Sequence, residues 1–271
     1  MNKLYLFTGA GNNFVVLDGR GADVSAFRKA EQIRALCTEH GTDGLMILDT
    51  PVIPGLTGDL TPDFSMEFYN PDGSGGMMCG NGGRCIVAFA DMLGLVPASG
   101  SCTFMAPDGV HTATILERKP VWTVRLKMVD VQEIRPMKGG YFLNTGTRHF
   151  VKFVEDVNAI DIGKEGPALR WDADFAPEGT NVNFVQVAPD GLHVRTFEKG
   201  VEGETLACGT GITASAIAAF RHGIPGQAGE GYRLQCKRGD WLYVDFKPVR
   251  NQFTNVYLTG PAELEKVFDS Q

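Results

Sequence analysis

Two cysteines lie in the same unusual sequence context, about half a chain length apart. Cys79 opens the motif CGNGGRC and Cys208 lies in ACGTG, so each cysteine is followed by two glycines with one residue between them. An apolar run at helical spacing follows each motif and stops at a glycine 15 residues after its cysteine. Each cysteine is therefore predicted to begin a helix, and we interpret the two as facing halves of one catalytic site.

A cysteine at the start of a helix has a chemical advantage. The first-turn backbone N–H groups have no partner within the helix and carry partial positive charge, so they favour a thiolate and lower its pKa. The same donors can bind a carboxylate, and Gly80, Gly82, Gly209 and Gly211 remove side chains that would keep an anion away. Two such helix ends could hold one carboxylate, with a thiol on each face of the neighbouring carbon.

This arrangement suits removal of a proton from carbon next to a carboxylate on one face, and its return on the other face. One cysteine must be a thiolate while its partner is a thiol, and the roles exchange in the reverse direction. No lysine lies in a recognisable cofactor-anchoring context. The reaction is therefore expected to run without pyridoxal phosphate or any other cofactor.

The cysteines allow two other interpretations. A metal site built on Cys79 and Cys85 is disfavoured, because no nearby His-x-x-x-His or second Cys-x-x-Cys completes it, and no metal is expected. A reversible disulfide between Cys79 and Cys208, in a redox or ligand-binding protein, remains the alternative from a different class. The remaining cysteines are predicted to be small buried core residues: Cys37, Cys85, Cys102 and Cys236.

Length, composition and charge limit the function classes. The 271 residues suffice for two domains, and a composition of 43% hydrophobic and 21% charged residues is typical of globular proteins. A net charge of -7 without a basic block argues against nucleic-acid and anionic-membrane partners, so a small molecule is expected instead. The N-terminus lacks a signal-peptide core and no run approaches a membrane span, which predicts a cytoplasmic protein with reduced thiols. The sequence is compatible with either a monomer or a homodimer.

The predicted strands that precede the two cysteine motifs repeat as well. Residues 7–18, FTGAGNNFVVLD, resemble residues 143–156, LNTGTRHFVKFVED, and each reads as a strand, a TG turn and a second strand. Strands outnumber helices throughout, and a short helix is expected after Pro261. These features predict an α+β protein of two similar domains, each wrapping its sheet around one buried helix.

The motifs as a set resemble those of the diaminopimelate epimerase family. The matching stretches are GAGNNF, TDGLMIL, FYNPDGSGGMMCGNGGRC, NVNF and FEKGVEGETLACGTG. The resemblance implies a cofactor-independent isomerase that interconverts LL- and meso-diaminopimelate on the route to lysine and peptidoglycan. It also implies a mixed β-barrel around each central helix, an active site in the interdomain cleft, and a tail from about 259 to 271 that returns to the first domain. The repeat itself places the junction of the two halves after residue 116, which gives domains at 1–116 and 117–258.

The resemblance also assigns roles by position. Cys79 and Cys208 match the two bases, and His149 and Glu198 match residues that adjust the thiol pKa values, with Glu198 also meeting the distal amino group. The backbone N–H groups of Gly80–Asn81 and Gly209–Thr210 match the donors that grip the reacting carboxylate. The expected substrate-binding residues are Asn12, Asn70, Gly80, Asn81, Thr147, Asn181, Lys199, Gly209 and Thr210.

Departures from the family pattern concentrate at the specificity end. Thr147 and Arg148 stand where the family commonly has an amide or serine and then a proline, and Lys199 stands where an arginine ordinarily clasps the distal carboxylate. Lysine keeps the charge but loses the planar two-pronged fit, and Arg148 is a candidate replacement. A racemase of the same family acting on another amino acid is therefore the close alternative. Thr8 and Asn13 replace a histidine and an aspartate of the family pattern.

Overall fold

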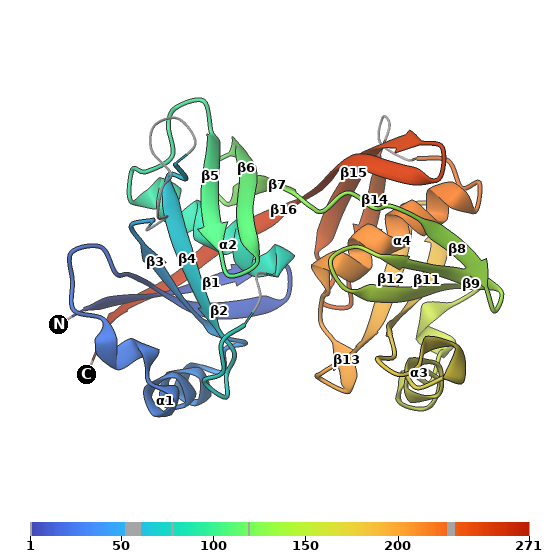
Figure 1. The fold of residues 1–271 in the computed structure, drawn as a ribbon, viewed down its shortest axis with the longest axis horizontal. Coiled ribbons are helices and arrows are strands. Elements are labelled where there is room, and N and C mark those ends of the chain that lie inside the picture. The colour runs from blue at the N-terminus through green and yellow to red at the C-terminus, as the bar shows by residue number, and fades with distance from the viewer. Residues whose placement is uncertain (1, 52–60, 77–78, 119, 227–230, 271) are drawn as a thin grey trace. The chain divides into compact units, whose positions relative to one another are not determined.

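The computed structural model describes residues 2–51, 61–76, 79–118, 120–226 and 231–270. The chain divides into two compact units (Figure 1), one formed by Met1–Leu126 with Gly260–Gln271 and the other by Lys127–Thr259. The boundary expected from the repeat, after residue 116, falls at the end of the sixth strand. None of the helices within the described ranges is both long enough and apolar enough to cross a membrane.

The first unit is a sheet that closes on itself around helix α2 (Gly80–Met92). Its strands follow one another in space as in the sequence: β1 (Lys3–Gly9), β2 (Asn12–Asp18), β3 (Leu45–Asp49), β4 (Phe64–Tyr69), β5 (Ser101–Ala106), β6 (Gly109–Glu117) and β7 (Trp122–Lys127). The C-terminal strand β16 (Gln252–Asp269) neighbours β7 and pairs antiparallel with β1, with Lys3 opposite Asp269. Because β16 bonds to both edge strands, the described strands form a closed barrel.

Helix α1 (Ala30–His40) covers the outside of this barrel, preceded by the 3-10 turn η1 (Ser25–Arg28). Its buried residues Ile33 and Leu36 pack against outward-facing residues of the strands, among them Val15 and Leu17. The alternation along β2 therefore buries one set of side chains under α1 and the other set toward α2, which explains why the strand is apolar on both faces.

The second unit wraps its sheet around helix α4 (Gly209–Arg221). Its spatial order begins at β16 and continues through β15 (Trp241–Val249), β14 (Tyr232–Gln235), β12 (Gly191–Glu198), β11 (Asn181–Ala188), β10 (Arg148–Val154), β9 (Gly140–Asn144) and β8 (Ile134–Met137), with β13 (Gly203–Thr205) paired to β12. Helix α3 (Ile162–Arg170) packs outside, with the 3-10 turns η3 (Val157–Ala159) and η4 (Ala173–Phe175).

The two units repeat one pairing plan, so the α+β fold of two similar domains is confirmed. From β1 to β6 successive pairs alternate antiparallel, parallel, antiparallel, parallel, antiparallel. The same alternation runs through β9, β10, β11, β12, β14 and β15. The two stretches matched by sequence, residues 7–18 and 143–156, lie in the first hairpin of each plan. Helices α2 and α4 follow the fourth strand of each plan, at equivalent places.

Both central helices are buried along most of their length, and small residues permit this. In α2 every residue from Gly80 to Ala90 is buried, and in α4 the buried set includes four alanine, serine or threonine positions in succession from Thr213 to Ala216. A Cβ atom added at Gly9 would lie 2.8 Å from Cys85 Sγ, so strand β1 and helix α2 approach as closely as glycine allows.

One predicted element is wrong. The segment after Pro261 was expected to be a short helix, but it is the second half of strand β16. Residues from Glu263 to Asp269 find their hydrogen-bond partners on β1, and this long-range pairing overrides the local helical preference of a sequence such as AELEK.

Candidate active site

Cys79 is the N-cap residue of α2, with extended backbone angles of φ -105° and ψ 152°. The backbone N–H of Gly82 donates to its sulfur at 3.2 Å, and the side chain is partly exposed. The first backbone hydrogen bond at the start of the helix runs from Gly83 N to Cys79 O. The N–H groups of Gly80 and Asn81 therefore precede the hydrogen-bond ladder and are placed as helix N-terminal donors.

Cys208 holds the equivalent position in the second unit. It is the N-cap of α4, with φ -133° and ψ 108°, and it is 8% exposed. The first backbone bond of this helix runs from Ile212 N to Cys208 O, so the N–H groups of Gly209 and Thr210 also precede the ladder. Its sulfur lies 3.4 Å from the hydroxyl of Thr210. The prediction that each cysteine begins a buried helix is confirmed.

The remaining cysteines lie in different surroundings. Burial raises the pKa of the Cys85 thiol to about 12, and burial does the same for Cys102. Burial also raises the pKa values of Cys37 and Cys236. These thiols are core residues, as the sequence predicted, and a thiol with a raised pKa is a poor base or nucleophile at neutral pH. Within the described residues no group of three or more His, Cys, Asp or Glu side chains is placed to hold a metal ion.

His149, near the start of β10, is connected to Cys208 through the hydroxyl of Thr210. Its Nε2 atom lies 2.9 Å from the Thr147 hydroxyl and 3.0 Å from the Thr210 hydroxyl, and its Nδ1 atom lies 3.0 Å from the amide nitrogen of Asn183. The ring is fully buried, and this burial lowers the pKa of His149 to about 3, only partly offset by the bond to Asn183. The imidazole is therefore neutral at physiological pH.

Asn12 and Asn81 are brought together in the first unit. The amide nitrogen of Asn81 donates to Asn12 Oδ1 at 2.6 Å, and Asn81 Oδ1 accepts from the guanidinium of the fully buried Arg84 at 2.8 Å. With its oxygen engaged, Asn12 has its amide N–H groups left to donate. Asn70 instead donates to the hydroxyl of Ser74, in the loop that follows β4.

Asn181 ties three strand ends together. Its amide nitrogen donates to Arg148 O at 3.0 Å and to the Thr147 hydroxyl at 3.3 Å, while its oxygen accepts from the backbone N–H of Lys199 at 2.7 Å. Both ends of this amide are thus bonded to the protein. Glu198, at the end of β12, accepts from the Thr205 hydroxyl at 2.9 Å.

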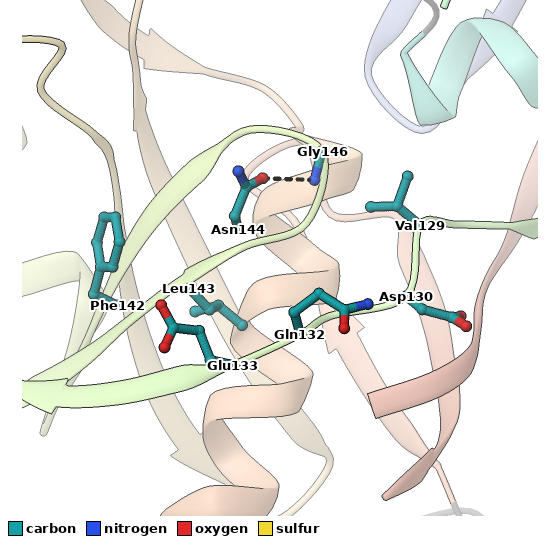
Figure 2. A pocket seen from close by; sticks show the side chains of 8 residues that line it. All are labelled: Val129, Asp130, Gln132, Glu133, Phe142, Leu143, Asn144 and Gly146. Atoms are coloured by element: carbon teal, nitrogen blue, oxygen red, sulfur yellow. Dashed lines mark hydrogen bonds between the residues drawn. The ribbon is translucent and has the colours of Figure 1, made fainter. Parts of the chain in front are cut away.

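Arg148 and Lys199 differ in their surroundings. Arg148 forms an ion pair with Glu178, and its guanidinium lies 5.2 Å from the centre of the Phe142 ring. Lys199 is exposed, at the turn after β12. A hollow of about 410 Å³ lies near the turn between β9 and β10 (Figure 2), where Asn144 Oδ1 accepts from Gly146 N. None of the predicted site residues lines this hollow.

Three buried residues escaped the sequence reasoning: Arg84, Asn183 and Thr196. Asn183 belongs to the NVNF motif, and its spacing of two from Asn181 on a strand was a signal that both amides share one face. Arg84 lies in CGNGGRC, five residues after Cys79, but nothing local indicates that its charged end is buried.

The chain is similar in sequence to proteins of one known family. Residues 141–264 match the family model described as Diaminopimelate epimerase. The diaminopimelate epimerase of Flavobacterium psychrophilum is 39% identical over 265 residues, which cover 96% of this chain and 97% of the relative. That of Chlorobaculum tepidum is 38% identical, covering 94% of this chain and 96% of the relative. This chain belongs to the diaminopimelate epimerase family.

Solved structures with little sequence identity share the family fold. A phenazine biosynthesis protein of the PhzF family from Bacillus anthracis is 12% identical, with a TM-score of 0.71, covering 100% of this chain and 99% of that one. A hydroxyproline epimerase from Agrobacterium vitis is 16% identical, with a TM-score of 0.66, covering 98% of this chain and 91% of that one. At this low sequence identity, the likenesses show that the two proteins share the fold of this chain.

Proposed function

We propose that the protein interconverts LL- and meso-2,6-diaminopimelate, with Cys79 and Cys208 as the two bases. The observation that carries the proposal is that, in a chain of this family, each repeat unit places one cysteine at the N-cap of its buried helix. Chain-wide similarity to named diaminopimelate epimerases supports the same substrate.

In this proposal the helix N-termini hold the carboxylate next to the reacting carbon. The N–H groups of Gly80, Asn81, Gly209 and Thr210 precede the backbone ladders of α2 and α4, so they can donate to an anion without breaking a helix bond. As the α-proton leaves, negative charge develops toward this carboxylate, and donors already in place stabilise that charge without reorganising.

The proton transfers balance without a cofactor. The thiolate of one cysteine takes the α-proton and becomes a thiol, while the bonding electron pair stays on the carbon and its carboxylate. The thiol of the other cysteine then gives its proton to the opposite face and becomes a thiolate. The centre is inverted, and the two cysteines have exchanged protonation states, as a reversible epimerase requires.

The far end of the substrate carries a second ammonium and a second carboxylate. The Glu198 carboxylate is proposed to meet the ammonium, and the exposed Lys199 to meet the carboxylate as a point charge. The Arg148 guanidinium already pairs with Glu178, which argues against it as the substitute clasp. Asn12 and Asn70 are proposed to donate to the substrate. Asn181 and Thr147 complete the proposed binding set.

The proposal is tested by incubating the purified protein with LL-diaminopimelate in deuterated water and following the α-position by NMR. Deuterium should enter the α-carbon as the meso isomer appears. Exchange into a different amino acid, with none into diaminopimelate, would move the assignment to a related racemase. Absence of exchange into any amino acid, from a folded protein with reduced thiols, would contradict the proposed reaction.

A further inference from the structure

A chain of polar side chains lies behind Cys208, almost entirely buried in the second unit. The hydroxyl of Thr196 donates to Asn183 Oδ1 at 3.0 Å, and Asn183 Nδ2 lies 3.3 Å from the carbonyl oxygen of Phe150 and 3.0 Å from His149 Nδ1. Thr196 is 4% exposed, and Asn183 and His149 are 0% exposed. Burying a polar group costs free energy of folding unless its hydrogen bonds are satisfied. The donor and acceptor roles along this series of side chains are therefore strongly constrained.

The bonds fix the orientation of the Asn183 amide and hence the tautomer of His149. The Phe150 carbonyl can only accept, so the atom facing it must be the NH₂ nitrogen of Asn183. The same nitrogen meets His149 Nδ1, which must therefore accept, leaving the single proton of a neutral imidazole on Nε2.

The Nε2–H of His149 points at two hydroxyl oxygens, those of Thr147 at 2.9 Å and Thr210 at 3.0 Å. Since Thr210 Oγ1 accepts from His149, its own proton is available for a further acceptor. Two are in reach: the Cys208 sulfur at 3.4 Å and Thr147 Oγ1 at 3.2 Å, which already receives the Asn181 amide. A charged acceptor roughly doubles hydrogen-bond strength, so a thiolate at Cys208 outcompetes a neutral hydroxyl.

We propose that Asn183, acting through His149 and Thr210, orients a hydroxyl donor at the Cys208 sulfur and thereby favours its thiolate form. The consequence for catalysis rests on the proposed function of Cys208 as a base. His149 and Asn183 are positioning residues in this scheme: the imidazole stays neutral and passes no proton. The hydrogen bonds run in one direction, each residue donating to the next, from Thr196 to Asn183, His149, Thr210 and Cys208. We call this series of hydrogen bonds the relay.

The surroundings of the His149 imidazole favour its neutral form. The three side chains bonded to His149 are uncharged, and burial of the ring opposes its protonation. The charged side chains at the neighbouring strand ends have other partners, since Arg148 pairs with Glu178 and Glu198 accepts from Thr205.

The relay is tested by the pH dependence of Cys208 alkylation with iodoacetamide, read by mass spectrometry of the peptide that contains it. Thr210→Val removes the donor and should move the alkylation midpoint up by about one to two pH units, since a bond to a charged group carries that differential. Thr210→Ser should restore the wild-type midpoint. Thr213→Val is the matched control, because its buried hydroxyl bonds to Gly209 O and not to the cysteine.

An unchanged midpoint in Thr210→Val would overturn the relay. A second measurement needs no variant: long-range proton–nitrogen NMR of the wild-type protein should show His149 as the neutral Nε2–H tautomer from pH about 5 to about 8. An Nδ1–H tautomer would also overturn it. Neither readout uses substrate, so a shifted midpoint without deuterium exchange into diaminopimelate would retain the relay and reject the proposed function.

Discussion

At the scale of single residues, two buried groups organise the polar side chains around the cysteines. Arg84 donates to Asn81 Oδ1, Gly80 O and Pro261 O, and so joins the first turn of α2 to the returning strand β16. Its bond to Asn81 sets which end of that amide faces Asn12. His149 has the corresponding place in the second unit. In both units, the residue two positions after the cysteine is bonded to a buried N–H donor, the Arg84 guanidinium for Asn81 and the His149 imidazole for Thr210.

Arg84→Met is expected to lower the free energy of unfolding by about 1–3 kcal/mol for each buried oxygen that loses its donor, and Gly80 O and Asn81 Oδ1 both do. It should also raise KM for the amino-acid substrate, since Asn81 and Asn12 lose their fixed orientation. Urea unfolding and steady-state kinetics check both effects. Arg118→Met is the control, because that arginine forms a partly exposed ion pair with Asp91 worth about 1 kcal/mol or less.

The buried His149 predicts a specific pH dependence of stability. Its pKa is about 3 in the folded protein and about 6.5 when unfolded, so between these values the unfolded chain binds the extra proton. The contribution of the neutral His149 to the free energy of unfolding is fully present above the pKa of the unfolded state. It is lost as the pH falls toward the pKa of the folded state, by up to about 1.4 kcal/mol per pH unit. In urea unfolding at a series of pH values, His149→Gln should show a shallower slope below pH about 6. Equal slopes would contradict this account.

At the scale of elements, much of the fold could be predicted because helices α2 and α4 carry their own signals. A cysteine and two glycines mark the start, apolar spacing marks the body, and a glycine marks the end. Helix α3 lacks such signals: it contains Gly163, Gly166 and Pro167, all poor helix formers, and forms by packing on the outer face of the second sheet. The strand after Pro261 was missed for the same reason, since its partner β1 lies at the other end of the chain.

The site was predictable only to the extent that its residues lie in local motifs. Cys79 and Cys208 could be found because each motif is repeated and contiguous. The bond between Asn183 and His149 joins residues 34 positions apart, and its existence depends on the parallel pairing of β10 with β11. No spacing rule within the sequence determines which strands pair across such a distance.

Gly211→Ala tests how tightly α4 fits its sheet. A Cβ atom there would lie 2.4 Å from Asn183 Oδ1 and 3.3 Å from Thr196 Oγ1, so it would displace these two hydrogen-bonded side chains. Overpacking costs about 1–3 kcal/mol, which exceeds the helix-propensity gain of up to about 1 kcal/mol, so net destabilisation is expected in thermal or urea unfolding. Gly203→Ala is the control, because its nearest atom would be Val201 O at 4.0 Å; equal losses in both variants would refute the packing argument.

At the scale of the whole molecule, the proposed chemistry is divided equally between two units of one repeated plan. Each unit supplies one N-cap cysteine and one set of helix N-terminal donors, and neither unit contains both thiols. The proposed two-base inversion uses an acid and a base on opposite faces of the carbon, and a duplicated domain is a direct way to provide both. The two sulfurs nevertheless differ, because Cys79 accepts from a backbone N–H and Cys208 is approached by a hydroxyl.

The requirement for both thiols is tested by the rate at which Cys79→Ser and Cys208→Ser convert LL- to meso-diaminopimelate. Cys102→Ala serves as the control for loss of a buried thiol remote from the helix starts. Each serine variant should lose about 10²- to 10⁴-fold in kcat, and the double variant should lose little more, because the two groups act as one unit. Near-normal conversion by either serine variant, in a folded protein, would contradict the two-base account.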